Sequence, residues 1–578
     1  MNIFDGGENP KDYADEHPRV SSRAIKDPIH DYITVSATLS RFIDTKQFQR
    51  LRNIKQLGTT AYVWPGATHT RFEHSLGVAH LARTMATHIK DSQPELKLTD
   101  RDVDCVELAG LCHDLGHGPW SHVWDGSFIP IALAGTGKSW KHEDGSEMML
   151  DYLVSDNNIK IALEDQRFIK ALISGERARA RYFFVTQRSP HEKGFLFDIV
   201  ANKRNGIDVD KLDYFHRDSH MIGDPIHLSL TRFVKSARVI NNEICYAIKD
   251  ANSVYELGQA RFKLHKLIYN HKTAVAIEFM LIDALLAAEP VLHIAEDVFK
   301  PEKFLHLTDH IMSRIEASEE PELAESRAIM DRIHSRDLYI CVDHKTIDWP
   351  FRDLFKKHVT REHIVEAVHG SSQYPIIDED GQVVVLPNAA SLTVSDVIVS
   401  FSTLHCGMKE KNVLDFVKFY SKRKPNESMK ASRGEYSNLM PQYFAEDLLR
   451  IYTKNAELFG LIQAGYRAIL AKMQALEEAE LGTTVSAAVT VTGGTAVPTP
   501  PATEAPSTPP APSRKASLTL IPGGSGAVST PFSNNSFTTV EPTFVPPSPT
   551  RATRRVSGGK RQLEEGAASA SGTHKRRR

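Results

Sequence analysis

Apolar residues recur at three- and four-residue spacing through most of the first 480 residues, and this period restricts the chain to a fold built mainly from helices. The spacing predicts helices over Phe72–Lys90, Asp100–Asp114, Val209–Asp218, Val254–Ala288 and Tyr443–Glu480. Short runs with strand character predict a small antiparallel sheet from Leu338–Val342, Val383–Leu386 and Val397–Phe401. The expected fold class is therefore mainly α, with a small antiparallel β region in the C-terminal lobe.

The composition changes near Glu480. From about Gly482 to Thr550 the chain consists largely of Thr, Ser, Ala and Pro, and 13 of its 30 prolines follow residue 480. A segment of this kind buries too little apolar surface to offset the entropy lost on ordering, so we expect it to be disordered. The expected parts are an N-terminal arm (1–26), a helical core (27–330), a C-terminal lobe (331–480) and a disordered Thr/Ser/Pro-rich basic tail (481–578).

Charge is distributed unevenly along the chain. The tail from Leu481 carries 11 Lys and Arg against 4 Asp and Glu, whereas the residues before it carry 59 against 68. The five cysteines are scattered and form no CxxC pair, which excludes a disulfide framework or a zinc ribbon and favours a reducing compartment. The N-terminus lacks the apolar run of a secretory signal, and no stretch approaches the ~20 uncharged apolar residues of a membrane span. We expect a soluble intracellular protein with no membrane partner.

His74 lies on the apolar stripe of the first predicted helix, together with Val78 and Leu81. An imidazole on that face needs a partner. Taken alone, His74 is more simply interpreted as a hydrogen-bonded core histidine, and a single His-Asp pair such as His113-Asp114 is weak support for a metal site. Adjacent residues on a helix point about 100° apart, so this pair could share one ion only near a helix end or with the ion between them.

More polar residues follow the pair. Residues 113–125 contain three histidines and two aspartates, interrupted by two glycines and a proline, and this pattern is typical of a site built at a helix end. A helix from Val209 would place Asp210, Tyr214 and Asp218 on one face, with Lys211 at its edge. That face would offer carboxylates, an aromatic ring and a cation suited to phosphate.

Residues 71–77, 113–125 and 202–218 resemble the HD-domain superfamily of metal-dependent phosphohydrolases. Within that superfamily, the chain looks like the deoxynucleoside triphosphate triphosphohydrolases of the sterile-alpha-motif and HD-domain type, with similarity from about Asp27 to Asn455. Only about 26 residues precede this region, so no sterile-alpha-motif domain is expected ahead of it. The resemblance implies that the core is an HD phosphohydrolase that cleaves a dNTP to a deoxynucleoside and inorganic triphosphate.

The resemblance also implies the composition of the metal centre. Two imidazoles and two carboxylates would be its ligands: His74, His113, Asp114 and Asp210. Such a mixed nitrogen and oxygen set suits a divalent ion of the iron, manganese or zinc type. A second ion, Mg²⁺, would be held mainly by the phosphates of the substrate.

Other positions match family residues around the metal centre. Those expected to transfer protons or to bind phosphate are His117, His122, His142 and Asp125, and which histidine is the general acid stays open. Lys211 and Arg71 are expected to bind phosphate. The other predicted substrate-binding residues are Gln56, Tyr214, Asp218, Arg261, His265 and Tyr269. Among these, Gln56 and Asp218 would bind the 3′-hydroxyl, and Tyr269 would crowd the 2′ position.

Members of this family are regulated by nucleotides that assemble a tetramer. A GTP or dNTP activator would contact Asp44, Gln49, Arg52, Arg232, Lys249, His271 and Lys272. Three positions depart from the family pattern, because Lys26 and Ser253 replace asparagines and Ser229 replaces an aspartate. These departures leave the identity of the activator open.

The tail contains spaced basic clusters at Arg554-Arg555, Lys560-Arg561 and Lys575–Arg578. They resemble a bipartite nuclear-import signal, so we expect a nuclear location, with the cytoplasm as the alternative. The same clusters could bind single-stranded nucleic acid weakly through its phosphates.

Two other functions fit part of the sequence. An HD-family phosphodiesterase or phosphatase acting on another nucleotide would share the metal ligands but not the sugar pocket of Gln56, Asp218 and Tyr269. A non-catalytic nucleic-acid-binding scaffold would need only the basic tail. The products formed from a dNTP distinguish these alternatives.

Overall fold

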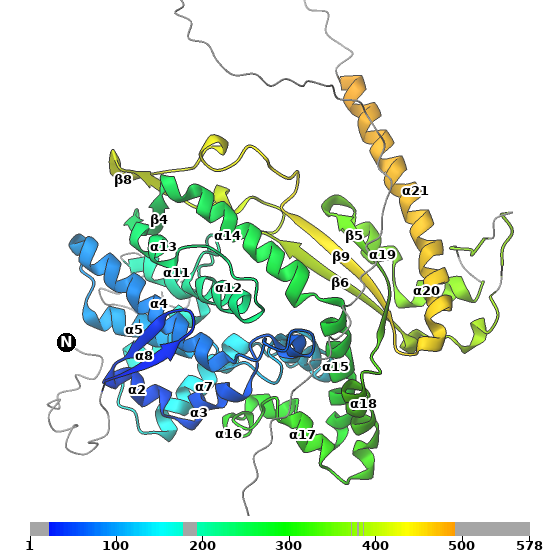
Figure 1. The fold of residues 1–578 in the computed structure, drawn as a ribbon, viewed down its shortest axis with the longest axis horizontal. Coiled ribbons are helices and arrows are strands. Elements are labelled where there is room, and N and C mark those ends of the chain that lie inside the picture. The colour runs from blue at the N-terminus through cyan, green and yellow to red at the C-terminus, as the bar shows by residue number, and fades with distance from the viewer. Residues whose placement is uncertain (1–21, 177–192, 371–372, 378–380, 385, 492–578) are drawn as a thin grey trace, which may run out of the picture. The chain divides into compact units, whose positions relative to one another are not determined.

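A computed structural model describes residues 22–176, 193–370, 373–377, 381–384 and 386–491 (Figure 1). These residues belong to one compact unit, Met1–Thr495. The last helix, α21 (Phe459–Val491), extends beyond Glu480, where the sequence predicts the end of the folded region. For 478–491 only the backbone is described, and the rest of the predicted disordered tail, 492–578, lies outside the described residues.

Helices make up most of the described chain, as the apolar spacing predicts. Up to residue 264 they are α2 (Ala37–Ile43), α3 (Lys46–Gln49), α4 (Arg71–Ser92), α5 (Asp100–Cys112), α6 (Ile129–Ala132), α7 (His142–Asp156), α8 (Leu163–Ser174), α11 (Phe197–Val200), α12 (Val209–Met221), α13 (Leu230–Ser236) and α14 (Ala251–Leu264). After it come α15 (Lys272–Leu292), α16 (Pro301–Phe304), α17 (Ile311–Glu316), α18 (Ala324–Ser335), α19 (Arg352–His358), α20 (Arg361–Val368) and α21. In the part of the chain searched, no helix combines the length and apolar character needed to cross a bilayer.

The strands form small sheets. Antiparallel β1 (Arg23–Asp27) and β2 (Asp31–Val35) make a hairpin ahead of the helices. A second sheet has the order β3-β4-β7-β8, from Arg238–Ile240, Glu243–Ala247, Phe419–Ser421 and Lys424–Met429, with β4 and β7 parallel. The third is antiparallel, in the order β5-β9-β6, from Ile340–Asp348, Ala445–Thr453 and Val397–His405, and its outer strands overlap two of the three predicted strands. Of the predicted strand Val383–Leu386, Val383 forms an isolated bridge with Ile377.

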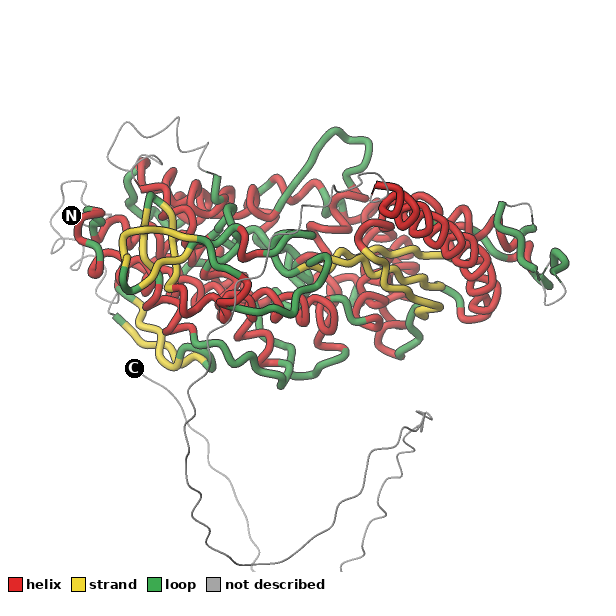
Figure 2. Tube along the Cα trace, turned by 90° about the horizontal axis from the view of Figure 1, so that it is seen from above, coloured by secondary structure: helices red, strands yellow, loops and turns green. Residues whose placement is uncertain are grey.

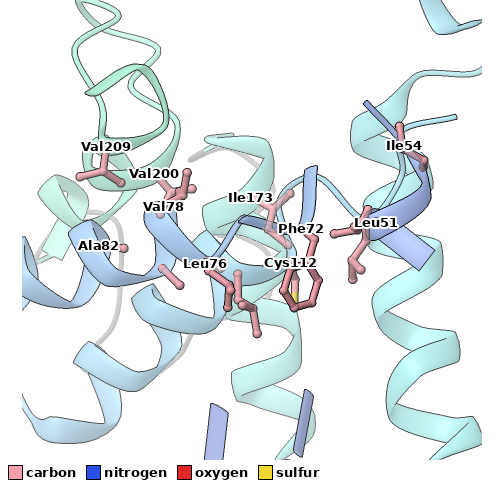
Figure 3. Packing of buried hydrophobic residues seen from close by; sticks show 14 of the residues in the cluster. Leu51, Ile54, Phe72, Leu76, Val78, Ala82, Cys112, Ile173, Val200 and Val209 are labelled. Atoms are coloured by element: carbon pink, nitrogen blue, oxygen red, sulfur yellow. The ribbon is translucent and has the colours of Figure 1, made fainter. Parts of the chain in front are cut away.

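Close packing of α4 against α5 sets the framework of the core. A Cβ atom added at Gly110 of α5 would lie 3.1 Å from the carbonyl oxygen of Val78 and 3.1 Å from the Cβ of Ala82, both in α4. Thr99 caps α5 as predicted, because its side chain accepts a hydrogen bond from the Asp102 amide at 3.2 Å. Figure 3 shows Val78 and Ala82 in the apolar cluster that also contains Val200 and Val209. This contact brings the start of α4 to the end of α5.

A second apolar cluster fills the C-terminal lobe. There, residues of β5, β6 and β9 pack with α19, α20 and α21. The strands of this sheet lie together beside the long helix α21 in Figure 2. Helix α18 runs through residue 330, where the sequence suggested a division between core and lobe.

Two of the predicted helices differ from the structure. The segment Val254–Ala288 is not continuous, because a π-helical turn over His265–Tyr269 ends it and α15 begins anew after His271. The first part of Tyr443–Glu480 is the central strand β9, whose two faces are covered so that its sequence reads as an apolar run. Periodicity alone does not separate such a buried strand from a buried helix.

The α4–α5 contact yields a prediction. In Gly110→Val, the added side chain would force the two helices apart, and overpacking of this kind typically lowers the free energy of unfolding by about 1–3 kcal/mol. Gly460→Ala in α21 is a matched control, because an added Cβ there meets nothing within 4 Å. Thermal unfolding of both variants should show a lower midpoint only for Gly110→Val. An unchanged midpoint for Gly110→Val would mean that the packing of α4 against α5 does not require a glycine at this position.

Candidate metal centre and substrate pocket

The four predicted metal ligands come together from three helices. His74 lies in the first turn of α4, His113 and Asp114 follow α5, and Asp210 lies in the first turn of α12. The Nε2 atom of His74 is 3.1 Å from Asp210 Oδ1 and 3.6 Å from Asp114 Oδ2. The Nε2 atom of His113 is 3.3 Å from Asp114 Oδ1 and 3.5 Å from Asp210 Oδ1. The structure therefore brings these four side chains to one point.

Hydrogen bonds on the outer side of both imidazoles orient them toward that point. The Nδ1 atom of His74 donates to Asp213 Oδ2 over 2.8 Å, and that of His113 donates to the carbonyl oxygen of Gly110 over 2.8 Å. Because Nδ1 is engaged on the outer side, an ion that replaced the proton of Nε2 would meet the lone pair of each ring. The buried Nε2 of His113 makes no hydrogen bond to any described residue. The geometry thus fits a metal ion.

The charges of the cluster also favour a cation. Burial alone would lower the pKa of His74, but its hydrogen bonds to Asp210 and Asp213 raise the pKa to about 10. Burial opposes the ionisation of Asp210, yet His113 and His74 together hold its pKa well below the ordinary value. The site therefore concentrates negative charge, and a divalent ion would balance it. Its nitrogen and oxygen donors suit a borderline transition metal.

A second cluster lies beside the metal ligands and consists of the four residues predicted for proton transfer and phosphate binding. The rings of His117 and His142 stack with centroids 4.2 Å apart. The Nδ1 atom of His142 is 2.5 Å from one oxygen of Asp125, and the Nδ1 atom of His122 is 3.4 Å from the other. Asp125 belongs to a π-helical turn, Trp124–Phe128, a local irregularity that often occurs at functional sites.

The residues of this second cluster differ electrostatically. Burial and the nearby Arg71 hold the pKa of His117 well below its ordinary value, so its imidazole is neutral. Burial also lowers the pKa of His142, but its hydrogen bond to Asp125 more than compensates, and the pKa rises. The side chain of His122 is 71% exposed. The Asp125 carboxylate is therefore placed to hold a proton on His142.

Both clusters open into one cavity of about 460 Å³. Its volume is typical of a pocket for a small ligand. Lys211 Nζ donates to Asp208 at 2.9 Å, and Arg71 Nη1 donates to Asp114 at 2.5 Å, so each predicted phosphate-binding cation is paired with a carboxylate. The cavity lining includes all of the predicted substrate-binding residues: Gln56, Arg71, Lys211, Tyr214, Asp218, Arg261, His265 and Tyr269.

The predicted sugar-binding residues meet in one part of the lining. The hydroxyl of Tyr269 donates to Asp218 Oδ2 over 2.7 Å, and the other oxygen of Asp218 lies 2.7 Å from His69 Nε2. Gln56 Oε1 is buried and makes no hydrogen bond to any residue that the structure describes. The rings of His265 and Tyr269 meet edge to face, 4.9 Å apart. This polar group can recognise hydroxyls of a ligand.

Several residues of the site were not found from the sequence. His69 holds Asp218, Asp213 holds His74, and the carbonyl oxygen of His405 accepts from Arg261. Glu278 also lines the cavity. Asp213 was discoverable, because it follows Asp210 by one helical turn, whereas His405 arrives on β6 from the C-terminal lobe and no spacing rule links it to Arg261.

The predicted activator residues lie in separate places. Asp44 pairs with Arg23 of β1 at 2.6 Å, and Arg52 Nε donates to Gln49 Oε1 at 2.7 Å. Arg232 and Lys249 line a second cavity of about 400 Å³. That cavity also contains Ser229, one of the departures from the family pattern. The remaining two predicted residues, His271 and Lys272, lie at the start of α15 and do not line it.

The class of protein follows from a comparison with known families. The HD domain family matches residues 71–218, a span that includes all four candidate metal ligands. The HD domain is a metal-dependent fold, and the cluster of His74, His113 and Asp114 is a possible metal site in this structure.

Individual relatives define the family more narrowly. The chain is 37% identical over 469 residues to the deoxynucleoside triphosphate triphosphohydrolase SAMHD1 homolog of Dictyostelium discoideum, covering 80% of this chain and 83% of the relative. It is 39% identical over 466 residues to deoxynucleoside triphosphate triphosphohydrolase SAMHD1 of Homo sapiens, covering 76% and 72%. The Bos taurus protein of that name is 39% identical over 462 residues, with 75% of each covered. The chain belongs to this SAMHD1 family of HD-domain enzymes.

Glu278 in the cavity lining yields a prediction about stability and pH. Burial raises its pKa to about 7, although a hydrogen bond to Thr59 opposes the shift. Because folding raises the pKa of this carboxyl, the folded state holds its proton more tightly than the unfolded state does. The free energy of unfolding of the wild type should therefore fall as the pH rises from ~4.5 to ~7. Glu278→Gln has no carboxyl to ionise and should not show this loss. At pH 8 its free energy of unfolding should exceed that of the wild type by about 2 kcal/mol, a figure reduced to allow for partial hydration of the cavity. Thermal melts at pH 5 to 8 test this expectation, and parallel curves for the two proteins would contradict it.

Proposed function

We propose that this protein is a metal-dependent hydrolase that cleaves dNTPs to a deoxynucleoside and inorganic triphosphate. The observation that carries the proposal is a single cavity with three of the candidate ligands, His113, Asp114 and Asp210, in one part of its lining and the Tyr269–Asp218 hydrogen bond in another. This arrangement places hydrolytic chemistry and hydroxyl recognition within the reach of one nucleotide. The names of the relatives point to the same substrate class.

The reaction forms a bond between water oxygen and the α-phosphorus and breaks the bond from that phosphorus to O5′. A bound divalent ion supplies Lewis acidity that polarises the phosphoryl group and activates water. His74, His113, Asp114 and Asp210 would hold it. Lys211 and Arg71 would bind phosphate oxygens, and because both are already paired with carboxylates, they would orient the chain of phosphates more than neutralise it.

The departing O5′ requires a proton. The imidazole of His142, hydrogen-bonded to Asp125, is the best placed donor among the three histidines of the second cluster. The imidazole of His117 is neutral, and its Nε2 atom lies 3.3 Å from Asp114 Oδ1. This residue is therefore suited to orienting phosphate or water. His122 shares the Asp125 carboxylate and could return a proton from solvent, because it is exposed.

Selection of the deoxyribose would rest on Gln56, Asp218 and Tyr269. Asp218 would accept a hydrogen bond from the 3′-hydroxyl while Tyr269, fixed by its bond to Asp218, fills the space at the 2′ position. Exclusion by packing gives graded selectivity, so some hydrolysis of ribonucleotides is expected. We propose iron, manganese or zinc at the HD ligands and Mg²⁺ on the phosphates, which elemental analysis of purified protein would test.

We propose that a GTP or dNTP activator assembles a homotetramer and that the enzyme serves to control dNTP pools. Asp44, Gln49 and Arg52 would form one activator contact, and Arg232, Lys249, His271 and Lys272 would contribute others. The departures Lys26, Ser229 and Ser253 leave open which nucleotide activates this chain. Sedimentation of the protein with and without GTP or dNTPs tests this assembly, and the nucleotides should raise the mass to that of a tetramer. A mass that stays the same when they are added would contradict the proposal.

We further propose that the basic tail directs the protein to the nucleus and binds single-stranded nucleic acid weakly. Its clustered Lys and Arg residues support both roles. A protein ending at Thr495 should keep the turnover of the full chain, remain in the cytoplasm and lose salt-sensitive retention on single-stranded DNA. Retained nuclear accumulation would contradict the import role.

Removal of a metal ligand provides the main test of the hydrolase. Asp210→Ala should reduce bound metal and dNTP turnover by more than about 100-fold, because it removes one of two carboxylate ligands. Asp224→Ala is the control, since that aspartate lies just beyond the same helix and its side chain is 60% exposed. Chromatography should detect deoxynucleoside and triphosphate from the control. Diphosphate or monophosphate products would instead identify a different HD hydrolase, and no products from any dNTP would favour a scaffold.

A further inference from the structure

A buried carboxylate behind the metal ligands connects three elements of the fold. Asp213 of α12 accepts hydrogen bonds from His74 Nδ1 at 2.8 Å, from His30 Nε2 at 2.6 Å and from Arg217 Nε at 2.8 Å. The side chains of Asp213 and Arg217 are fully buried, and that of His30 is 4% exposed. His74 is therefore oriented by a carboxylate that is itself fixed from two other directions.

The backbone of α4 is shaped to admit this network. A Cβ atom at Gly77 would lie 1.9 Å from Asp213 Oδ1 and 2.5 Å from Arg217 Nη2. Only a residue without a side chain leaves room for both groups, one turn after His74. The network is thus packed directly against the helix that carries the metal ligand.

The hairpin β1–β2 supplies the other end of the network. Asp27, the last residue of β1, accepts from Arg217 Nη1 at 2.8 Å through Oδ2. Its second oxygen, Oδ1, accepts from the amides of Ile29 and His30, each at 2.9 Å. One carboxylate therefore fixes the conformation of the turn, the position of His30 and the position of Arg217.

The other charged side chains of the hairpin form exposed ion pairs. Lys26 pairs with Asp31, and the two side chains are 64% and 74% exposed. Arg23 pairs with Asp44, a predicted activator residue, and those side chains are 40% and 53% exposed. The hairpin therefore has a solvent-facing side that reaches the predicted activator contact and a buried side that reaches His74.

We propose that the β1–β2 hairpin sets the affinity of the HD site for its metal ion, with Asp27 and His30 acting through Arg217 and Asp213 to hold the imidazole of His74. These four are positioning residues, since none of them is among the proposed ligands. The inference rests on the proposed metal site. Because coupling between two ligands is reciprocal, a nucleotide that displaced the hairpin would change metal affinity, and bound metal would change nucleotide affinity equally.

The test uses the full chain, stripped of metal, and measures its affinity for Mn²⁺ alone by competition with a chelator. Asp27→Asn keeps an oxygen that accepts from the two amides of the turn but removes the charge that faces Arg217. We expect Mn²⁺ affinity to fall about tenfold, the lower limit for residues that orient metal-ligating histidines. Asp31→Asn is the matched control, because it removes the same charge from the same hairpin on its exposed side. Its affinity should equal that of wild type.

A second pair of variants separates positioning from folding. His30→Ala removes the donor to Asp213 and should weaken Mn²⁺ binding, whereas His30→Gln retains an N–H donor and should restore part of the affinity. Equal affinities for wild type, Asp27→Asn and His30→Ala would overturn the role of the hairpin. If wild type and His113→Ala bound Mn²⁺ equally, or if neither bound it, the proposed metal site would fail and this inference with it.

Discussion

The convergence of three carboxylates, two of them buried and one partly buried, is the constraint on which the rest of the structure depends. Asp114, Asp210 and Asp213 converge between α4, α5 and α12, where isolated ionised groups would be strongly destabilising. Arg71 compensates Asp114, and Arg217 compensates Asp213. Asp210 faces the two imidazoles instead. The charge that remains without a permanent counterion is therefore concentrated at the point where the four candidate ligands meet.

The same electrostatic balance affects the rest of the cavity. Lys211 and Arg71 are each neutralised by a neighbouring aspartate, so neither contributes its full charge to a bound polyanion. Arg261 and Lys203 also line the cavity, and a bound metal ion would add to the positive charge available to a triphosphate. The assignment to the HD family and the charge distribution of the lining are independent observations, and both favour a bound metal ion.

Local patterns predicted the parts of the site that lie on single helices. His74 could be placed on a buried stripe and Asp210 on the same face as Tyr214, because helical periodicity fixes those relations. The resemblance to a known family then grouped residues from different helices. Contacts made by side chains from distant segments were not predictable, such as His30 with Asp213 and Arg261 with His405. The strand β9 was read as helix because both of its faces are buried. The break after Tyr269 was missed because neither glycine nor proline occurs between His265 and Lys272 to mark it.

The contribution of β6 to the cavity has a consequence for the modular organisation of the chain. The HD match ends at residue 218, yet Arg261 and Tyr269 line the cavity, and Arg261 is tethered to the main chain at the end of β6. The strand β7 likewise returns from beyond residue 400 to pair with β4. A fragment cut at the limits of the HD match would keep the ligands but lose a wall of its pocket. Homologous recombination between relatives would therefore keep the contacts of the pocket together if it exchanged residues 56–405 as one segment.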